Sequence, residues 1–346
     1  MTPPRRCLHV PPTNGTRLLG GLLAVLSLAG CWVRVPPRFE PPPPRLPLDA
    51  FDVADLRGRD PLVVLVFGDS GTGSDEQAEV GRRMARTCAA RGCDLALMLG
   101  DNFYPRGVAP RPPGSWDEAF VRKFEAPYEQ LVGLQFWAIA GNHDWHGGRD
   151  SVDTEVAYSL RSERWRMPAY DYVVPALPAW VTIYALDTVV LLQGVGIGQL
   201  ERGRRALCDA RGWRILMGHA PVYSSGPHGG TSGSNTAARA ALLPLLRDCD
   251  VDLYLSGHEH HQEHLVAGEL HQLVQGAAAR VRSVTARSAG PATQRFVASR
   301  YGFALLEISP LTVEIEFFGY PPGVPDAFGS IYRATILNRR GAAAPR

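Results

Sequence analysis

Residues 95–108 of the chain read LALMLGDNFYPRGV, and the rest of the predicted fold can be built outward from them. The run 95–99 is apolar and ends at Gly100, which is the pattern of a short buried strand. In α/β sheets, ligands bind beyond the carboxyl ends of such strands. Asp101 and Tyr104 directly follow this strand, so we expect the carboxylate and the phenol to face a functional site.

The same construction occurs four more times, as an apolar run, a glycine, and then side chains that can bind a metal ion. The five segments are LVVLVFGD (62–69), LALMLGDNFY (95–104), FWAIAGNHD (136–144), ILMGH (215–219) and LYLSGHEH (253–260). We expect the five strand ends to converge on one point. The side chains gathered there would be Asp69, Asp101, Tyr104, Asn142, His219, His258 and His260.

These oxygen and imidazole donors suit iron, manganese or zinc. Two such ions can clamp a phosphoryl group and supply a hydroxide nucleophile. A lone aspartate after a strand more often caps the following helix, which is the simpler interpretation of Asp69 taken by itself. Because the same pattern recurs in five ordered motifs, metal binding is the better interpretation for the seven residues taken together. Asp144 and Glu259 are expected either to orient the ligands or to be loop residues, and His261, His264 and His271 to be surface or satisfied polar residues.

The motifs GDSG, GDNFY, GNHD, GHAP and GHEH, in this order, resemble those of the calcineurin-like metallophosphoesterases. The tyrosine three residues after Asp101 resembles the purple acid phosphatases. GDNFYPRGV, YSLRSERWRMPAY and ALDT are most similar to their small, tartrate-resistant subgroup. The resemblance covers residues 62–337. It implies an α/β fold, a sandwich of two mixed β-sheets flanked by helices. The length of 346 residues is ordinary for a single α/β domain, so we expect one catalytic domain, over residues 52–339.

The resemblance also implies a role for each residue. A ferric ion would be bound by Asp69, Asp101, Tyr104 and His260. A second ion, divalent iron, zinc or manganese, would be bound by Asp101, Asn142, His219 and His258, with Asp101 bridging the two. His143 would contact the phosphate or protonate the leaving group, and His228 stands near the place of another substrate-binding histidine.

The implied activity is that of an acid phosphatase, which hydrolyses phosphate monoesters with a metal-bound hydroxide. Two alternatives remain: a phosphodiesterase or nucleotidase with the same metal site, and a non-catalytic lipoprotein that binds metal or a partner. A formal net charge of +2 and 20% charged residues argue against nucleic acid as a partner. The sequence makes no prediction of the oligomeric state.

The first 30 residues predict a lipoprotein signal peptide, because three arginines precede the apolar run 18–29. The run ends in LAGC, which resembles a bacterial lipobox, although a plain cleaved signal is the alternative. Cys31 would then carry the lipid anchor in the bacterial cell envelope, and Trp32 favours the outer membrane. Residues 31–51 are proline-rich and predict an extended tether, and residues 340–346 a disordered tail.

Export would place the remaining cysteines in an oxidising compartment. Cys208 and Cys249 each end a helical segment before a ligand-bearing strand, so we expect them to pair, and Cys88 to pair with Cys93. Four cysteines allow three connectivities, and the spacing does not choose among them. A zinc knuckle is the other interpretation, but it lacks a Cys-x-x-Cys pair.

The remaining pattern predicts the other elements of the fold. Helices are expected at 76–90, 116–128, 199–210 and 237–248. Further strands are expected at 170–174 and 180–186, as part of a second sheet, and at 272–274, 303–308, 313–318 and 331–337.

Overall fold

The computed structural model describes residues 43–112, 114–194, 196–228, 234–284 and 290–341. The predicted signal peptide and Cys31 lie outside these residues. No helix in the described ranges is long and apolar enough to cross a membrane.

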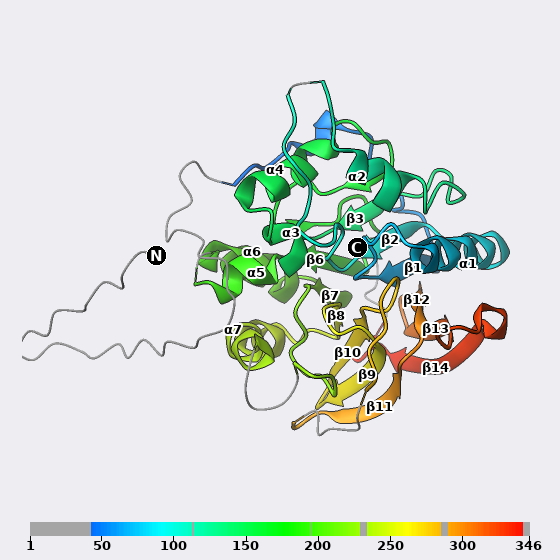
Figure 1. Ribbon diagram of the computed structural model, residues 1–346. Helices are drawn as coiled ribbons and strands as arrows, with labels where there is room; N and C mark the ends of the chain where they lie inside the picture. The colour runs from blue at the N-terminus through cyan, green and yellow to red at the C-terminus, as the bar shows by residue number, and fades with distance from the viewer. Residues whose placement is uncertain (1–42, 113, 195, 229–233, 285–289, 342–346) are drawn as a thin grey trace, which may run out of the picture. The chain divides into compact units, whose positions relative to one another are not determined.

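In the described part of the chain, the first sheet has seven strands in the order β14-β13-β12-β1-β2-β3-β4 (Figure 1). Four neighbouring strands run parallel: β1 (Leu62–Phe67), β2 (Leu95–Met98), β3 (Phe136–Ala138) and β4 (Trp165–Arg166). The other three are antiparallel to their neighbours: β12 (Tyr301–Ile308), β13 (Thr312–Tyr320) and β14 (Gly329–Leu337).

Within the described ranges, the second sheet also has seven strands, in the order β11-β9-β10-β8-β7-β6-β5. Its parallel strands are β6 (Val181–Ala185), β7 (Trp213–Met217), β8 (Leu253–Ser256) and β10 (Leu270–Gln275). The antiparallel strands are β5 (Tyr172–Val173), β9 (Gln262–Ala267) and β11 (Thr293–Ala298). Both sheets are therefore mixed, and the predicted α/β sandwich is confirmed.

Alternate residues of β1 face opposite sides of its sheet, as strand geometry requires. Val64 and Val66 pack in a core with Ile215 and Leu253 of the second sheet. Leu65 and Phe67 lie in a different core with residues of α1 (Asp75–Arg91). All six residues of β1 are buried, which explains its unbroken apolar sequence.

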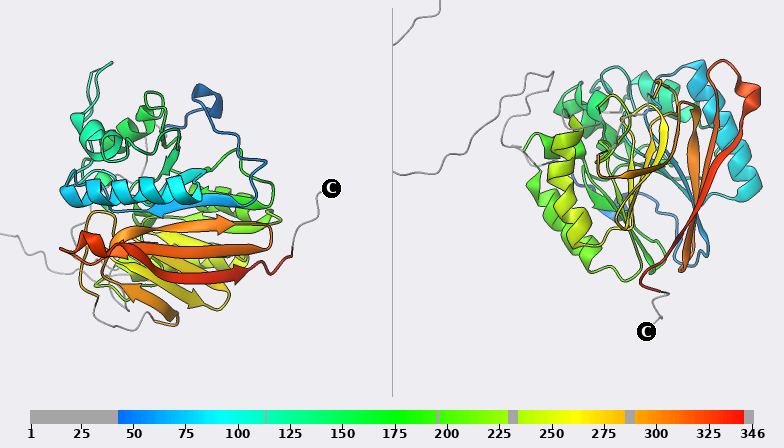
Figure 2. Two further views of the ribbon diagram at one scale, coloured as in Figure 1. Left: turned by 90° about the vertical axis from the view of Figure 1, so that its right-hand side faces the viewer. Right: turned by 90° about the horizontal axis from the view of Figure 1, so that it is seen from below.

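Helices cover the outer faces of both sheets (Figure 2). Helix α1 lies on the first sheet, and the Ser74 side chain caps it by accepting from the Gln77 amide. Helices α6 (Ile197–Cys208) and α7 (Ser234–Asp248) lie on the second sheet, where Leu207 and Leu245 pack in the core that contains Tyr254. The short helices α2 (Glu118–Phe120), α3 (Asn142–Trp145) and α4 (Arg149–Tyr158) group beside β3 in Figure 1.

Several predicted elements differ from the structure. The expected helix 116–128 is α2 followed by the π-helical turn η2 (Val121–Glu125). Helices α3, α4 and α5 (Thr188–Leu192) and strands β4, β9 and β11 were not predicted. Strand β9 reads QEHLVA, and its polar first residues are buried through pairing with β10 and β11, so it lacks an apolar pattern.

The predicted tether and tail both contribute residues to the folded part. Leu46 donates from its backbone to the Pro168 carbonyl at 2.8 Å, and Arg45 pairs with Asp171 at 3.0 Å. The short 3-10 helix η1 (Leu48–Ala50) follows them. Arg340 forms an ion pair with Asp252. The folded region therefore begins before residue 52 and reaches Arg340; the prediction missed these charged contacts because their partners are distant in sequence.

The two expected cysteine pairs are both present. Cys88 and Cys93 are bonded, with their Cα atoms 5.1 Å apart, and Cys208 is bonded to Cys249 with a Cα separation of 4.3 Å. The second disulfide joins the ends of α6 and α7 on the outer face of the second sheet. The zinc-knuckle alternative is thereby removed.

Candidate metal centre

The five glycine-terminated strands end at one edge of the sandwich, where the two sheets meet. Strands β1, β2 and β3 come from the first sheet, and β7 and β8 from the second. Contacts between their ends cross from sheet to sheet: His219 Nδ1 lies 2.8 Å from the Leu99 carbonyl oxygen, and the His258 amide donates to Asp69 Oδ2 at 2.8 Å.

The motif glycines allow this close approach. A Cβ atom on Gly100, whose φ is +90°, would lie 2.7 Å from His219 Nδ1. On Gly141 it would lie 2.3 Å from Asp101 Oδ1, and on Gly257 2.4 Å from Asp69 Oδ2. These separations are shorter than carbon and oxygen or nitrogen tolerate, so each position requires glycine.

Three candidate ligands have a left-handed backbone. Asp69 has φ of 56°, Asp101 of 53° and His258 of 70°. Such angles are uncommon for residues with a side chain and cost free energy, and they cluster at functional sites because they aim a side chain that a relaxed strand end would not. The side chains of these three residues, whose backbone is strained, all point into the same centre.

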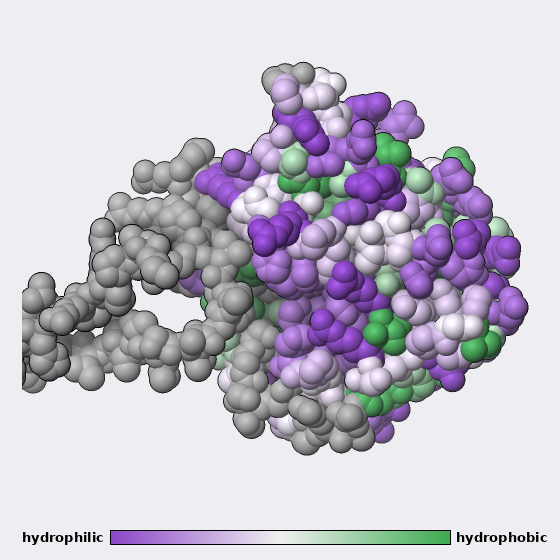
Figure 3. Space-filling view, viewed as in Figure 1, coloured by the Kyte–Doolittle hydropathy of each residue, from purple (hydrophilic) through white to green (hydrophobic). Residues whose placement is uncertain are grey.

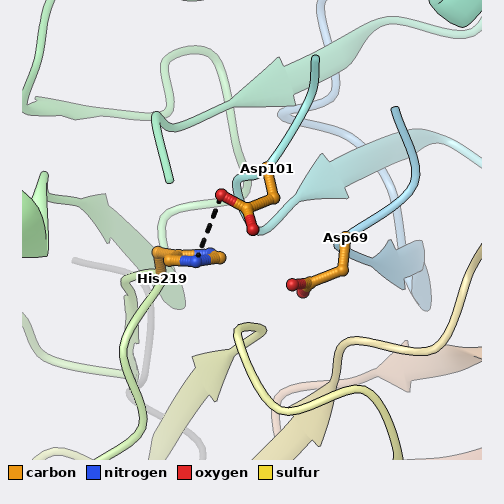
Figure 4. A group of neighbouring side chains, drawn as sticks. All are labelled: Asp69, Asp101 and His219. Atoms are coloured by element: carbon orange, nitrogen blue, oxygen red, sulfur yellow. Dashed lines mark ion pairs between the residues drawn. The ribbon is translucent and has the colours of Figure 1, made fainter. Parts of the chain in front are cut away.

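Asp69, Asp101 and His219 form the innermost group. One ligand atom from each lies within 4.8 Å of the other two, and all three residues are buried. Figure 4 shows the three side chains directed toward one another, with the ion pair between His219 Nε2 and Asp101 Oδ1 at 3.4 Å. The group can hold a metal ion.

The other four candidate ligands surround this group on two sides. On one side, the Tyr104 hydroxyl lies 3.1 Å from both Asp69 Oδ1 and His260 Nε2. On the other, Asn142 Oδ1 lies 3.0 Å from His219 Nε2 and 2.9 Å from His258 Nδ1. All seven residues predicted from the strand ends are therefore brought together.

The donor chemistry fits cations. His258 is half-buried, its Nε2 is a buried atom with no hydrogen-bond partner among the described residues, and its Nδ1 is 3.3 Å from His219 Nε2. Burial, with His219 and His228 beside it, holds the pKa of His258 well below the usual histidine value, so its imidazole is neutral. Neutral imidazole is the form that binds metal.

Without a cation, the pKa values of the Asp101 carboxyl and the Tyr104 phenol shift in opposite directions. Burial raises the pKa of the Asp101 carboxyl, but the neighbouring His219 and His143 more than compensate and the net pKa is lowered. Burial, with Asp101 and Asp69 nearby, raises the pKa of Tyr104 well above its usual value. Asp101 is therefore ready to bind metal, whereas Tyr104 needs a strong cation to ionise.

His143 and His228 lie at the rim of the centre. The His143 amide donates to Asp101 Oδ1 at 2.8 Å, its Nδ1 lies 2.8 Å from the Pro105 carbonyl oxygen, and its ring centre is 4.3 Å from that of Tyr104. The His228 ring is 4.7 Å from that of His258. Its amide donates to Glu259 Oε1 at 2.8 Å.

Buried carboxylates support the loops that carry the ligands. Asp144 accepts from the amides of Gly141 at 2.7 Å and Phe103 at 2.9 Å, which ties the loop after β2 to the loop after β3. Burial, with Asp101 nearby, raises the pKa of Asp144 to about 7. Asp187 caps α5 and accepts from Trp145 Nε1 at 2.7 Å.

Three other histidines have polar partners of their own, and two residues near the centre were not predicted. His261 Nε2 lies 3.0 Å from Glu263 Oε2, and His264 Nε2 lies 3.0 Å from His271 Nδ1, so these rings have polar partners.

Sequence reasoning missed Glu155, a buried side chain of α4 that contacts Asn102 at 3.3 Å. It also missed Arg280, whose guanidinium stacks on Tyr104. Neither lies in a motif, and no sequence signal marks them.

The model of the family described as calcineurin-like phosphoesterase matches residues 62–262, a region that contains every candidate ligand. The chain belongs to the calcineurin-like phosphoesterase family.

Among curated proteins, this calcineurin-like phosphoesterase is similar to purple acid phosphatases. It is 32% identical over 207 residues to tartrate-resistant acid phosphatase type 5 of Mus musculus, covering 53% of this chain and 60% of that protein. It is 25% identical over 303 residues to purple acid phosphatase 17 of Arabidopsis thaliana, covering 80% of this chain and 84% of that protein. The chain thus spans less than two thirds of the length of the first relative.

Solved structures share the fold of this calcineurin-like phosphoesterase. The GAP50 anchor of the inner membrane complex of Plasmodium aligns with a TM-score of 0.69 and 21% identity, over 82% of this chain and 90% of that one. Purple acid phosphatase PPD1 of yellow lupin aligns with a TM-score of 0.62 and 16% identity, over 82% of this chain and 55% of that one.

Proposed function

We propose that the chain is a metal-dependent acid phosphatase that hydrolyses phosphate monoesters at a dinuclear centre. The observation that carries this proposal is the convergence of seven metal-binding side chains, from five strand ends, around Asp69 and Asp101. The acid phosphatase relatives and the family support the same reaction.

The proposed ligands divide into two sets that share Asp101. A ferric ion would be held by Asp69, Asp101, Tyr104 and His260, and a divalent ion of iron, zinc or manganese by Asp101, Asn142, His219 and His258. The pair of ions, when bound, would neutralise charge on the phosphoryl oxygens and lower the pKa of water. The contacts of Tyr104 with Asp69 and His260, and of Asn142 with His219 and His258, support this division.

His143 is the proposed proton donor to the leaving group. Its Nδ1 faces the Pro105 carbonyl oxygen, which accepts only from a protonated nitrogen, so Nδ1 carries a hydrogen and Nε2 is the atom free for the substrate. The amide contact with Asp101 fixes the backbone of His143 at the centre. Protonated Nε2 would transfer its proton to the departing ester oxygen.

His228 is proposed to bind a phosphoryl oxygen. Its backbone is held by the Glu259 carboxylate, and Nδ1 lies 3.4 Å from Glu259 Oε2. Because Nδ1 faces that carboxylate, Nε2 is the ring nitrogen left for the phosphate. His228 and His143 thus approach the substrate from different loops.

The two alternative functions predict different behaviour. A phosphodiesterase would keep the same ligands and accept a diester. The non-catalytic alternative draws support from the solved structure with a similar fold that is described as an anchor in Plasmodium. In this chain, however, the complete set of seven candidate ligands favours catalysis.

We also propose a site of action outside the cytoplasm. The signal peptide 1–30, the lipidated Cys31 and the tether that follows it would attach the domain to the bacterial envelope, with the outer membrane favoured. The support is the lipobox-like sequence alone.

The test is hydrolysis of p-nitrophenyl phosphate and of bis(p-nitrophenyl) phosphate by protein purified without chelator. We expect the monoester to be preferred and Asp101→Asn to abolish turnover of both, while Asp248→Asn, an exposed control on α7, leaves it unchanged. Preference for the bis ester would favour the phosphodiesterase. No hydrolysis of either ester by protein with two bound metals would contradict catalysis.

A further inference from the structure

Arg280 lies beside the candidate metal centre, on the segment that follows β10. This segment is attached at two points. The Ala278 amide donates to the Gly68 carbonyl at 3.3 Å, and the Arg282 amide donates to the His260 carbonyl at 2.9 Å. Gly68 precedes the candidate ligand Asp69, and His260 is itself a candidate ligand. The backbone at Arg280 is therefore held between the first and the fifth motifs.

The Arg280 guanidinium stacks on a candidate ligand without bonding to it. Its Cζ atom lies 4.0 Å from the centre of the Tyr104 ring, within the range of a cation–π contact. The Tyr104 hydroxyl is directed to Asp69 and His260. Stacking fixes the guanidinium plane and leaves its N–H donors, which lie in that plane, free to bind something else.

Stacked arginines in the described ranges differ in their polar partners. Arg166 stacks on Phe51 and donates to backbone carbonyls, and Arg239 stacks on Tyr223 without a carboxylate partner among the described residues. Two others have carboxylate partners. Arg83 stacks on Phe328 and pairs with Glu79 at 2.6 Å. Arg164 stacks on Phe124 and pairs with Glu125. For Arg280 no hydrogen bond or ion pair is present within the ranges that the structure describes. What distinguishes Arg280 is its position: its half-buried guanidinium stacks on the candidate ligand Tyr104, so an anion bound at the metal centre lies next to its unpaired donors.

We propose that Arg280 is a specificity-determining residue that binds a second anionic group of the substrate, next to the phosphoryl group that is cleaved. This inference rests on the proposed function. The preferred substrate class would be phosphate compounds whose leaving group carries a further phosphate. A planar guanidinium binds phosphate through two parallel hydrogen bonds, which gives both affinity and orientation.

The cleaved phosphoryl group has other partners. The candidate metals would hold it, and His143 and His228 reach it from the rim. Arg280 belongs to a third segment, on the Tyr104 side of the centre. A permanent positive charge there selects for substrates with a negative charge beyond the cleaved group.

Binding provides the first test and does not depend on turnover. Calorimetry would compare inorganic phosphate, with one phosphoryl centre, and methylenediphosphonate, which has two and is not hydrolysed, on the metal-loaded protein. We expect Arg280→Ala to weaken the binding of methylenediphosphonate about 10- to 100-fold and the binding of phosphate less than about 3-fold. Arg280→Lys, which keeps the charge but not the planar fork, should lie between. Arg83→Ala is the matched control, because Arg83 of α1 stacks on Phe328 and not on a candidate ligand, and it should change neither.

Kinetics provides the second test, with ADP, whose leaving group carries a phosphate, and AMP, whose leaving group does not. Arg280→Ala should lower kcat/KM for ADP about 10- to 100-fold more than for AMP. Equal loss for both compounds, or equal weakening of phosphate and methylenediphosphonate, would assign Arg280 to the cleaved group and overturn the proposal. No change in either would overturn it as well. Arg280-dependent binding in a protein that hydrolyses no ester would instead refute the proposed function alone.

Discussion

Acid should destabilise the protein through His264, a buried histidine of β9. Its Nδ1 lies 2.8 Å from the Tyr332 hydroxyl and its Nε2 3.0 Å from His271 Nδ1. Burial, with His271 on β10 and Arg295 on β11 beside it, lowers the pKa of His264 from 6.5 to about 3. Between these two values the unfolded chain binds a proton that the folded chain does not.

The sign and size of the effect follow from this difference. Because the folded pKa is depressed, stability is complete above pH 6.5 and falls as the pH decreases from 6.5 toward 3. Each pH unit in that window costs about 1.4 kcal/mol of unfolding free energy. At pH 5, about 1.5 units below the unfolded pKa, the loss is about 2 kcal/mol.

Denaturant unfolding at pH 7 and pH 5 measures this loss. His264→Gln keeps hydrogen-bonding capacity without a titrating ring, so its unfolding free energy should fall by about 2 kcal/mol less than that of the unchanged protein. His146→Gln, at an exposed position, is the control and should behave like the unchanged protein. The reasoning is wrong if His264→Gln and the unchanged protein lose the same free energy between these pH values.

Three further outcomes are expected. His143→Ala should keep both metals, measured by elemental analysis, while turnover falls about 100-fold or more; loss of one metal equivalent would make His143 structural instead. Gly141→Ala should lower metal affinity, measured by competition with a chelator, because its Cβ would lie 2.3 Å from Asp101 Oδ1; an unchanged affinity would contradict the tight packing. Cys31→Ser should move the protein from the membrane fraction to the soluble fraction, since an acyl chain contributes about 0.8 kcal/mol per buried methylene; unchanged fractionation would count against lipidation.

The centre was predictable because its residues lie where short apolar runs end. Leu95–Met98 is buried on both faces, so its sequence is continuously apolar, and the turn at Gly100 is needed for the approach of His219. Strand polarity then determines that Asp101 follows the strand at the ligand-binding edge. The backbone periodicity and the glycine positions are local properties, and they can be read without knowing the fold.

Contacts that depend on the path of a loop were not predictable. Arg280 stacks on Tyr104, 176 positions earlier in the chain, and no periodic pattern precedes it. The face of the molecule in Figure 3 shows the same limit at the surface: it is mainly hydrophilic with isolated hydrophobic side chains, so composition does not distinguish one part of it from another. The sequence therefore predicts which residue types lie at the strand ends, whereas the structure adds the contacts between residues that are distant in the chain.

Metal content and visible absorption, measured together on protein purified without chelator, test the central claim most directly. We predict two metal equivalents per chain, one of them iron, and a visible band from the Tyr104 phenolate bound to the ferric ion. Tyr104→Phe should lose the band, although Asp69, Asp101 and His260 can still hold a metal. Active protein with two zinc or manganese ions, no iron and no band would contradict the ferric assignment, and active protein with fewer than two metals would contradict the dinuclear centre itself.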